Sequence, residues 1–207
     1  MNFRTGALAG VLLSLFLFNS AAFAQGTDHW ETVILPGRTC HYLVPGSAVD
    51  PAWTTSGFDD SGWTYSIGGV GYGDDDDNII INPAISVYCR YNITLSSPEV
   101  ITQLLLDMDF DDGFVAYLNG VELARYNMGE AGSPTTWDQP ADTLQEAQVY
   151  QGMAPLRFTL DPSVTDLLVQ GANTFALEVH NESAGSSDLS SNPYLHAGVG
   201  VSGSYFH

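Results

Sequence analysis

Hydrophobic and polar positions alternate with a period of two along much of the chain, a pattern that predicts strands rather than helices. The alternation is clearest at residues 114–118, where the positions point in turn to two different faces. Asn119–Gly120 follows directly, and this pair is the strongest short signal for a β-hairpin because both residues accept positive φ. The alternation resumes at residues 121–125. We therefore predict a hairpin within residues 104–127.

Similar short runs recur between segments rich in Gly, Pro, Ser, Asn and Asp. The other predicted strands cover residues 34–44 (interrupted by Pro36–Gly37), 63–67, 79–81, 85–95, 100–108, 156–160, 174–180 and 194–205. Helical periodicity is nearly absent, apart from one short turn over 164–168 that Asp161 could cap. This arrangement predicts an all-β jelly-roll sandwich. Residues 128–154 form a long connection of the kind that is usually functional or mobile.

The N-terminal segment has the pattern of a secretory signal peptide. Arg4 precedes an apolar run over 9–18, and the small residues at 22–24 satisfy the cleavage rule. We predict that residues 1–24 are removed and that residues 25–207 form a single exported domain of a bacterial protein. No later apolar run is long enough to span a bilayer.

The charge balance excludes several partners. Asp and Glu number 24 against 5 Lys and Arg, giving a formal net charge of −19, and the chain contains no Lys. DNA, RNA and anionic membranes each require a basic surface, so none is an expected partner. The acidity is compatible with bound divalent cations, with a saline habitat, or with solubility alone.

Two cysteines, Cys40 and Cys89, both lie in strand-like surroundings. Because export permits disulfides, we predict a Cys40–Cys89 bridge between the first strand and a central one. Two buried free thiols are the alternative. A metal site is not expected at these positions, because neither cysteine has a neighbouring ligand at suitable spacing.

Four adjacent carboxylates, Asp74, Asp75, Asp76 and Asp77, follow a glycine-rich segment. Such charges repel one another unless something neutralises them. Ca²⁺ prefers oxygen ligands in irregular loops, so this segment is the predicted site of a structural calcium ion. A solvated acidic loop is the alternative.

A second acidic segment contains Asp107, Asp109, Asp111 and Asp112, and it ends at Gly113. A spacing of two in a strand places the first three on one face. They could border a binding site or face water. The segment matches an EF-hand loop poorly, because Gly falls one place late and no Glu closes the loop.

The remaining polar candidates favour structure over catalysis. We expect Arg90 and Arg125 to form internal ion pairs, with a ligand contact as the alternative. His180 and Asn181 end a strand, and Ser187 and Asp188 lie in the next loop. No serine lies in a Gly-x-Ser-x-Gly nucleophile elbow, so we do not expect this set to make the protein an enzyme.

Several of these pieces occur together in one known family. The chain resembles the galactose-binding-like jelly-roll modules of secreted bacterial proteins, a likeness that rests on Trp53 with residues 58–63, on 67–74, 88–90, 111–120, Arg125, Asn127, 171–173, 179–181 and 187–188. The resemblance implies a jelly-roll fold. It also implies that Asp112 has a structural role in its turn, hydrogen-bonding the backbone of a loop.

A flat aromatic side chain near Asp and Asn is the usual surface for a sugar ring. Trp137, with Tyr126 and Tyr150, is the predicted platform, and loop packing is the alternative. The full set of candidate ligand-binding residues is Trp137, Tyr126, Asp111, Asp112, Asn119, Arg125, Asn127, His180 and Asn181. We predict a secreted, non-catalytic, calcium-stabilised module that binds carbohydrate. The alternative is an extracellular structural or adhesive protein that binds protein partners or self-assembles.

Overall fold

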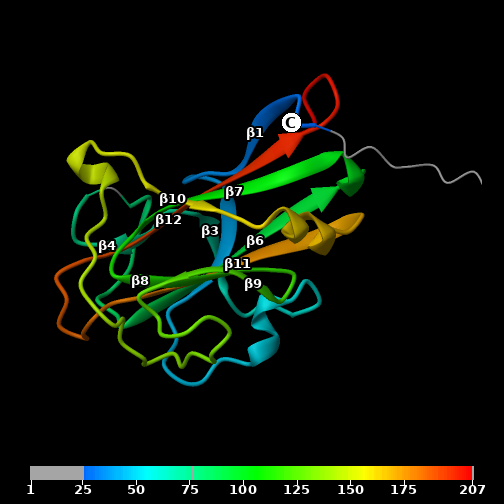
Figure 1. Cartoon of the computed structure of the whole chain (residues 1–207). Helices are drawn as coiled ribbons and strands as arrows, with labels where there is room; N and C mark the ends of the chain where they lie inside the picture. Colours follow the sequence, from blue (N-terminus) through cyan, green and yellow to red (C-terminus); the bar gives the residue numbers. More distant parts are fainter. Residues whose placement is uncertain (1–25, 76, 207) are drawn as a thin grey trace, which may run out of the picture.

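Two β-sheets packed face to face make up the architecture (Figure 1). The computed structural model describes residues 26–75 and 77–206, so the predicted signal peptide and Asp76 lie outside the described residues. The strands are β1 (His29–Ile34), β2 (Thr39–Leu43), β3 (Thr64–Ile67), β4 (Val70–Tyr72), β5 (Ile79–Ile80), β6 (Ser86–Leu95), β7 (Ile101–Phe110), β8 (Gly113–Leu118), β9 (Val121–Tyr126), β10 (Leu156–Thr159), β11 (Gly171–His180) and β12 (Leu189–Val199). Short 3₁₀ helices are η1 (Pro51–Thr54), η2 (Pro98–Val100), η3 (Val149–Gln151) and η4 (Pro162–Leu167).

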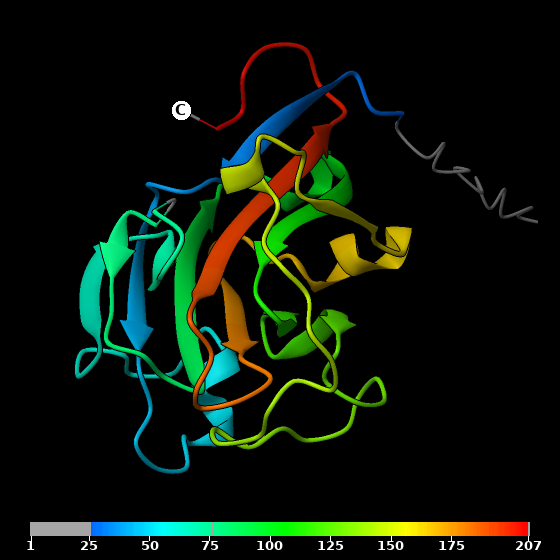
Figure 2. The same ribbon diagram turned by 90° about the vertical axis from the view of Figure 1, so that its left-hand side faces the viewer.

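The first sheet has the order β10-β7-β12-β4-β5, and β1 also pairs with β12. The second sheet has the order β3-β2-β6-β11-β8-β9. All pairs are antiparallel except β4 with β5. The first and last strands of the chain pair with each other, as Figure 2 shows for β1 and β12. The predicted all-β sandwich is confirmed.

The core lies between the two sheets. Phe175, Leu177 and Val179 project from β11 toward it, because alternate residues of a strand point to the same face. Aromatic rings from both sheets meet there edge to face, including Phe110 with Phe114, at a centroid separation of 4.7 Å. This geometry is the favoured one for aromatic pairs.

The outer face of the second sheet is also covered. Ala176, on the opposite face of β11 from the core, is buried with Trp53 and Tyr88 in a second apolar cluster. The loop over 44–63 and the loop over 127–148 pass across this face and supply the covering side chains. As a result the strand β11 is buried on both sides, and polar residues on its outer side lie beneath the loops.

Local predictions that depend on turn chemistry are confirmed. β8 ends at Leu118 and β9 begins at Val121, and the two residues between them have φ of 50° and 89°, as the Asn-Gly turn requires. The predicted helical turn is η4, where Asp161 accepts a hydrogen bond from the Ser163 amide.

Two predicted strands have different bounds. The opening strand predicted over 34–44 is divided at Pro36–Gly37 into β1 and β2, which belong to different sheets. The closing strand begins at Leu189, inside the predicted polar loop, and ends at Val199. The polar residues at 190–192 are buried because β12 is paired on both sides there, with β4 and β7. The polar side chains of this segment predict a loop, but its backbone pairs with neighbouring strands and is therefore part of β12.

The predicted disulfide is not formed, and both cysteines are buried free thiols. The register of β2 and β6 pairs Tyr42 with Cys89, which leaves Cys40 and Cys89 diagonal to each other. Diagonal positions are typically farther apart than a disulfide spans. The thiols still interact, and a hydrogen bond with Cys89 lowers the pKa of Cys40.

Within the described part of the chain, no helix is long and apolar enough to cross a membrane.

Candidate functional site

An aromatic cleft of about 330 Å³ lies on the outer face of the second sheet. Its aromatic lining consists of Trp53, Tyr88, Tyr117 and Trp137, and its polar lining includes Thr54, Thr135 and Thr136. Tyr88 lies on β6 and Tyr117 on β8, so the strands form the floor. The two covering loops form the walls, and Trp137 is a partly exposed residue of one wall.

A buried carboxylate supports the floor of this cleft. Glu178 Oε1 accepts hydrogen bonds of 2.7 Å from the hydroxyls of Tyr117 and Thr135, and Oε2 lies 3.2 Å from Nε2 of His180. Burial alone would raise the pKa of Glu178, but the interactions with His180, Tyr117 and Thr135 together lower it below the usual value. The carboxylate therefore remains ionised, with partners for both of its oxygens.

The loop that bears Trp137 is attached to the second sheet at Trp137 and at two residues that follow it. Ser86 Oγ donates to the Trp137 carbonyl at 2.6 Å, and His180 Nδ1 lies 2.8 Å from the Gln139 carbonyl. The Ala141 amide donates to the Asn181 carbonyl at 2.8 Å. These contacts fix the wall of the cleft before any ligand arrives, which lowers the entropic cost of binding.

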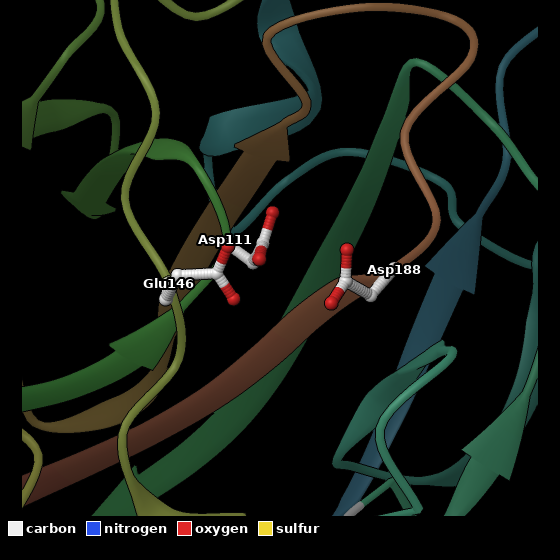
Figure 3. A group of neighbouring side chains, drawn as sticks. All are labelled: Asp111, Glu146 and Asp188. Atoms are coloured by element: carbon white, nitrogen blue, oxygen red, sulfur yellow. The ribbon is translucent and has the colours of Figure 1, made fainter.

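A second candidate site is a cluster of carboxylates from three separate segments (Figure 3). Asp111 follows β7, Glu146 belongs to the 127–148 loop, and Asp188 precedes β12. One oxygen from each lies within 4.8 Å of the others, so the three could hold a metal ion together. Tyr150 Oη lies 3.5 Å from a Glu146 oxygen at the margin of the cluster.

Asp111 is the unusual member of this carboxylate cluster. Its side chain is 2% exposed, and its Oδ1 is buried without a hydrogen-bond partner. Burial, followed by the charges of Asp112, Asp188 and Glu146, raises the pKa of Asp111 to about 9. A proton or a cation is therefore required to neutralise this oxygen.

The adjacent Asp112 shows the opposite situation. Its Oδ1 accepts from the Gln145 amide at 2.7 Å, and its Oδ2 accepts from the Glu182 amide at 2.8 Å. Asp112 thereby ties two loops to the turn between β7 and β8. The structural role that the family resemblance implies for Asp112 is present in full.

The segment predicted to bind calcium does not form a comparable group. Asp74 accepts from Ser190 Oγ at 3.2 Å, whereas Asp75 is exposed and has a φ of 64°. Asp74, Asp75 and Asp77, the three described carboxylates of this segment, do not converge as the Asp111 cluster does. The carboxylates of the Asp111 cluster instead come from three separate segments.

The predicted ligand-binding residues are divided among several places. Trp137 borders the cleft, while Tyr126, Arg125 and Asn127 line a different, open hollow along β9. The Tyr126 ring packs against Phe110 at 5.3 Å.

Two further predicted residues have structural contacts. Asn119 bonds Asn173 and the Leu167 carbonyl at the far end of the hairpin. The side-chain amide of Asn181 donates to Tyr72 Oη at 2.9 Å and to the Ala84 carbonyl at 2.7 Å.

The two predicted internal ion pairs are confirmed. Arg90 Nε lies 2.8 Å from Asp60, and Arg125 Nη2 lies 2.9 Å from Glu122. Arg90 is almost completely buried between the 44–63 loop and the sheet, where it also stacks over Phe58. These scarce cations stabilise the covering loops.

Sequence reasoning missed Glu146 and Glu178 and did not consider Asp188 as a metal ligand. Glu146 is an isolated acidic residue in a long polar connection, with no local pattern to mark it. Glu178 had a usable signal, because it is the only charged position in the alternating run over 174–180 apart from His180. A charged residue on the outward face of a central strand indicates a position beneath a covering loop.

Comparisons with known proteins place the fold. No protein-family model matches the sequence, and no curated protein matches it. Solved structures do match: a β-glucuronidase from Bacteroides uniformis has 17% identity and a TM-score of 0.50, over 82% of this chain and 18% of that chain. A β-glucuronidase from glycoside hydrolase family 2 has 14% identity and a TM-score of 0.51, over 83% of this chain and 18% of that chain.

A third match is a glycoside hydrolase family 2 member from Bacteroides cellulosilyticus, with 12% identity and a TM-score of 0.50, over 81% of this chain and 20% of that chain. The chain thus spans about a fifth of the length of these enzymes. At such identities the likeness concerns the fold alone, and it corresponds to one β-sandwich part of much larger glycosidases.

Proposed function

We propose that this chain is an exported, non-catalytic carbohydrate-binding module whose ligand occupies the aromatic cleft beside Trp137. The observation that supports the proposal is the combination of a partly exposed indole and two tyrosines around one open cleft of about 330 Å³. Export follows from the predicted signal peptide.

The chemistry of the cleft suits a sugar. The apolar face of a pyranose packs against a flat aromatic ring, and its hydroxyls need hydrogen-bonding groups at the edge of that ring. Trp137 offers such a ring, while Thr54 and Thr136 offer hydroxyls in the same lining. The anchored loop supplies the rigidity that a weakly binding polar ligand requires.

The charge of the cleft favours neutral glycans over acidic ones. No arginine or lysine is among the residues that line it, and Glu178 lies directly beneath. A uronic acid would bring its carboxylate toward this negative region without a cation to receive it. The fold neighbours named β-glucuronidases agree with a carbohydrate ligand in general terms, and the cleft itself argues for neutral sugars.

The test is titration of the mature protein with neutral oligosaccharides selected on a glycan array. We expect Trp137→Ala to weaken binding by about tenfold or more, because the stacking surface is lost. Trp30→Ala is the matched control, since Trp30 is an exposed indole on β1. Equal loss in both variants, or binding unaffected by Trp137→Ala, would contradict the proposal.

Calcium, expected from the sequence, belongs to this proposal as a stabilising ion with no role inside the cleft. Its support is the acidic composition together with a group of carboxylates that could hold a metal. Calcium is favoured among divalent ions because the donors are all oxygen atoms.

A further inference from the structure

The cluster of Asp111, Glu146 and Asp188 differs from an ordinary acidic surface patch in its convergence. Surface carboxylates turn away from one another into water, because like charges at short range repel. Here the three side chains turn toward a common point from three different segments (Figure 3). Glu146 is exposed and Asp188 half-buried, so the point is reachable from solvent, whereas Asp111 forms its buried base.

Asp111 gives the second, independent indication of a ligand. Its Oδ1 is buried and lacks a hydrogen-bond partner, although it lies beside two further carboxylates. Leaving such an acceptor unsatisfied costs about 1–3 kcal/mol, and more for a charged group. The adjacent Asp112 has amide donors on both oxygens, so the fold does supply donors at this turn. It supplies none to Asp111 Oδ1.

Cationic side chains elsewhere in the molecule are already engaged. The four arginines within the described residues contact other groups: Arg38 the Asn92 carbonyl, Arg90 Asp60, Arg125 Glu122 and Arg157 Asp107. The chain contains no lysine. None of these arginines therefore forms an ion pair with the cluster, and the remaining sources of positive charge are a proton or an external cation.

We propose that Asp111, Glu146 and Asp188 bind a calcium ion. The inference rests on the calcium component of the proposed function and is independent of the carbohydrate component. Oxygen atoms of one coordination shell lie within a few ångströms of one another, as the three carboxylates do. The absence of His and Cys from the set disfavours zinc, and irregular loop ligands disfavour the strict octahedron of magnesium.

The bound ion would connect three segments at one point: the turn after β7, the 127–148 loop and the loop that precedes β12. The second of these also bears Trp137 and forms a wall of the cleft. Calcium would thus hold the end of this loop that is distant from Trp137, complementing the contacts near the indole. The expected consequence is protection of the loop against proteolysis and hydrogen exchange.

The experiment is calorimetric titration of EDTA-stripped mature protein with CaCl₂, paired with thermal melts in EDTA and in millimolar calcium. We expect one saturable site and a calcium-dependent rise in melting temperature. Glu146→Gln and Asp188→Asn should weaken binding by on the order of tenfold or more. Glu146 is exposed, so its variant should fold normally and keep the test interpretable.

The matched control is Asp166→Asn, which removes the same charge from an exposed position on η4. It should retain the wild-type calcium affinity. Absence of calcium binding by the wild type at millimolar concentration would overturn the inference. So would equal weakening in Asp166→Asn, or loss of binding on Asp75→Asn with the cluster variants unaffected. Sugar titrations of the same samples would succeed or fail separately.

Discussion

Two buried carboxylates in different regions of the molecule differ in whether the protein supplies hydrogen-bond partners for their oxygens. Glu178, beneath the aromatic cleft, has protein partners for both oxygens, and its pKa is lowered despite burial. Asp111, at the base of the carboxylate cluster, has an oxygen without a partner, and its pKa is raised to about 9. The first region is complete as folded, and the second requires something from outside the chain.

The largest test of this comparison is Glu178→Ala. Removing the carboxylate leaves His180, Tyr117 and Thr135 without their acceptor in a buried place. We expect the free energy of unfolding to fall by about 3–5 kcal/mol, the usual cost of breaking a buried pair. Denaturant unfolding measures it, and Glu178→Gln should lose less because an acceptor remains. A loss well below 1 kcal/mol would show that the network is not structural.

A smaller loss is expected from Gly73→Ala. Gly73 has a φ of 114°, and an added Cβ would lie 2.5 Å from the Asp188 Cβ. Backbone strain should cost about 1–3 kcal/mol, and the displaced Asp188 should weaken calcium binding. Gly37→Ala is the control, because Gly37 has a φ of 95° and open space around it. Calorimetry should find weakened calcium binding in Gly73→Ala alone. Equal weakening in both variants would argue against Asp188 as a calcium ligand.

The comparison is sharpest in Asp111→Asn, where the sign of the effect should reverse. In EDTA we expect the unfolding free energy to stay constant or rise by up to about 1 kcal/mol, because an amide avoids the cost of burying or protonating a carboxylate among like charges. The new amide can donate to Glu146 or Asp188. Thermal melts with and without calcium test this, since the variant should gain nothing from the ion. If Asp111→Asn in EDTA lost as much stability as Glu178→Ala, Asp111 would have stabilising partners within the protein, as Glu178 does.

A third carboxylate, Glu31, should show the smallest and most local effect. Burial raises its pKa, but hydrogen bonds from His29 and from the amides of Tyr205 and Phe206 outweigh burial and hold it at about 2. Its contribution to the stability of the folded state is therefore present above pH 4.5 and is lost as the pH falls toward 2. The protection of the amides at residues 205–206 against exchange, relative to the intrinsic rate at each pH, should fall across this range, and Glu31→Gln should lack this protection at every pH. A protection factor that does not change with pH would show that Glu31 does not hold this segment.

The sequence predicts the fold well because the fold depends on local chemistry. Alternation over 114–118 and the Asn-Gly turn each dictate their own backbone, and the structure confirms them. The closing strand was misplaced because Ser190, Ser191 and Asn192 look like loop residues. Their burial comes from strands distant in sequence, which no local pattern encodes.

The carboxylate cluster shows why site prediction is harder. Four consecutive aspartates attracted the calcium prediction, but the three of them that the structure describes do not form a group with converging oxygens. The cluster instead unites residues 111, 146 and 188, which the sheet topology brings together. Trp137 was recognisable as a partly exposed aromatic in a long connection, whereas the tyrosines that share its cleft became visible only once the strands were placed.

The pairing of the first and last strands has a practical consequence for tethering. β1 and the segment that follows β12 lie at one end of the sandwich, held by β1–β12 pairing and by Glu31. Figures 1 and 2 show the 44–63 loop and the loop that bears Trp137 at the opposite end. A linker, a fusion partner or a solid support joined to either terminus would therefore leave the cleft directed outward, and immobilised protein should retain the full accessibility of this surface.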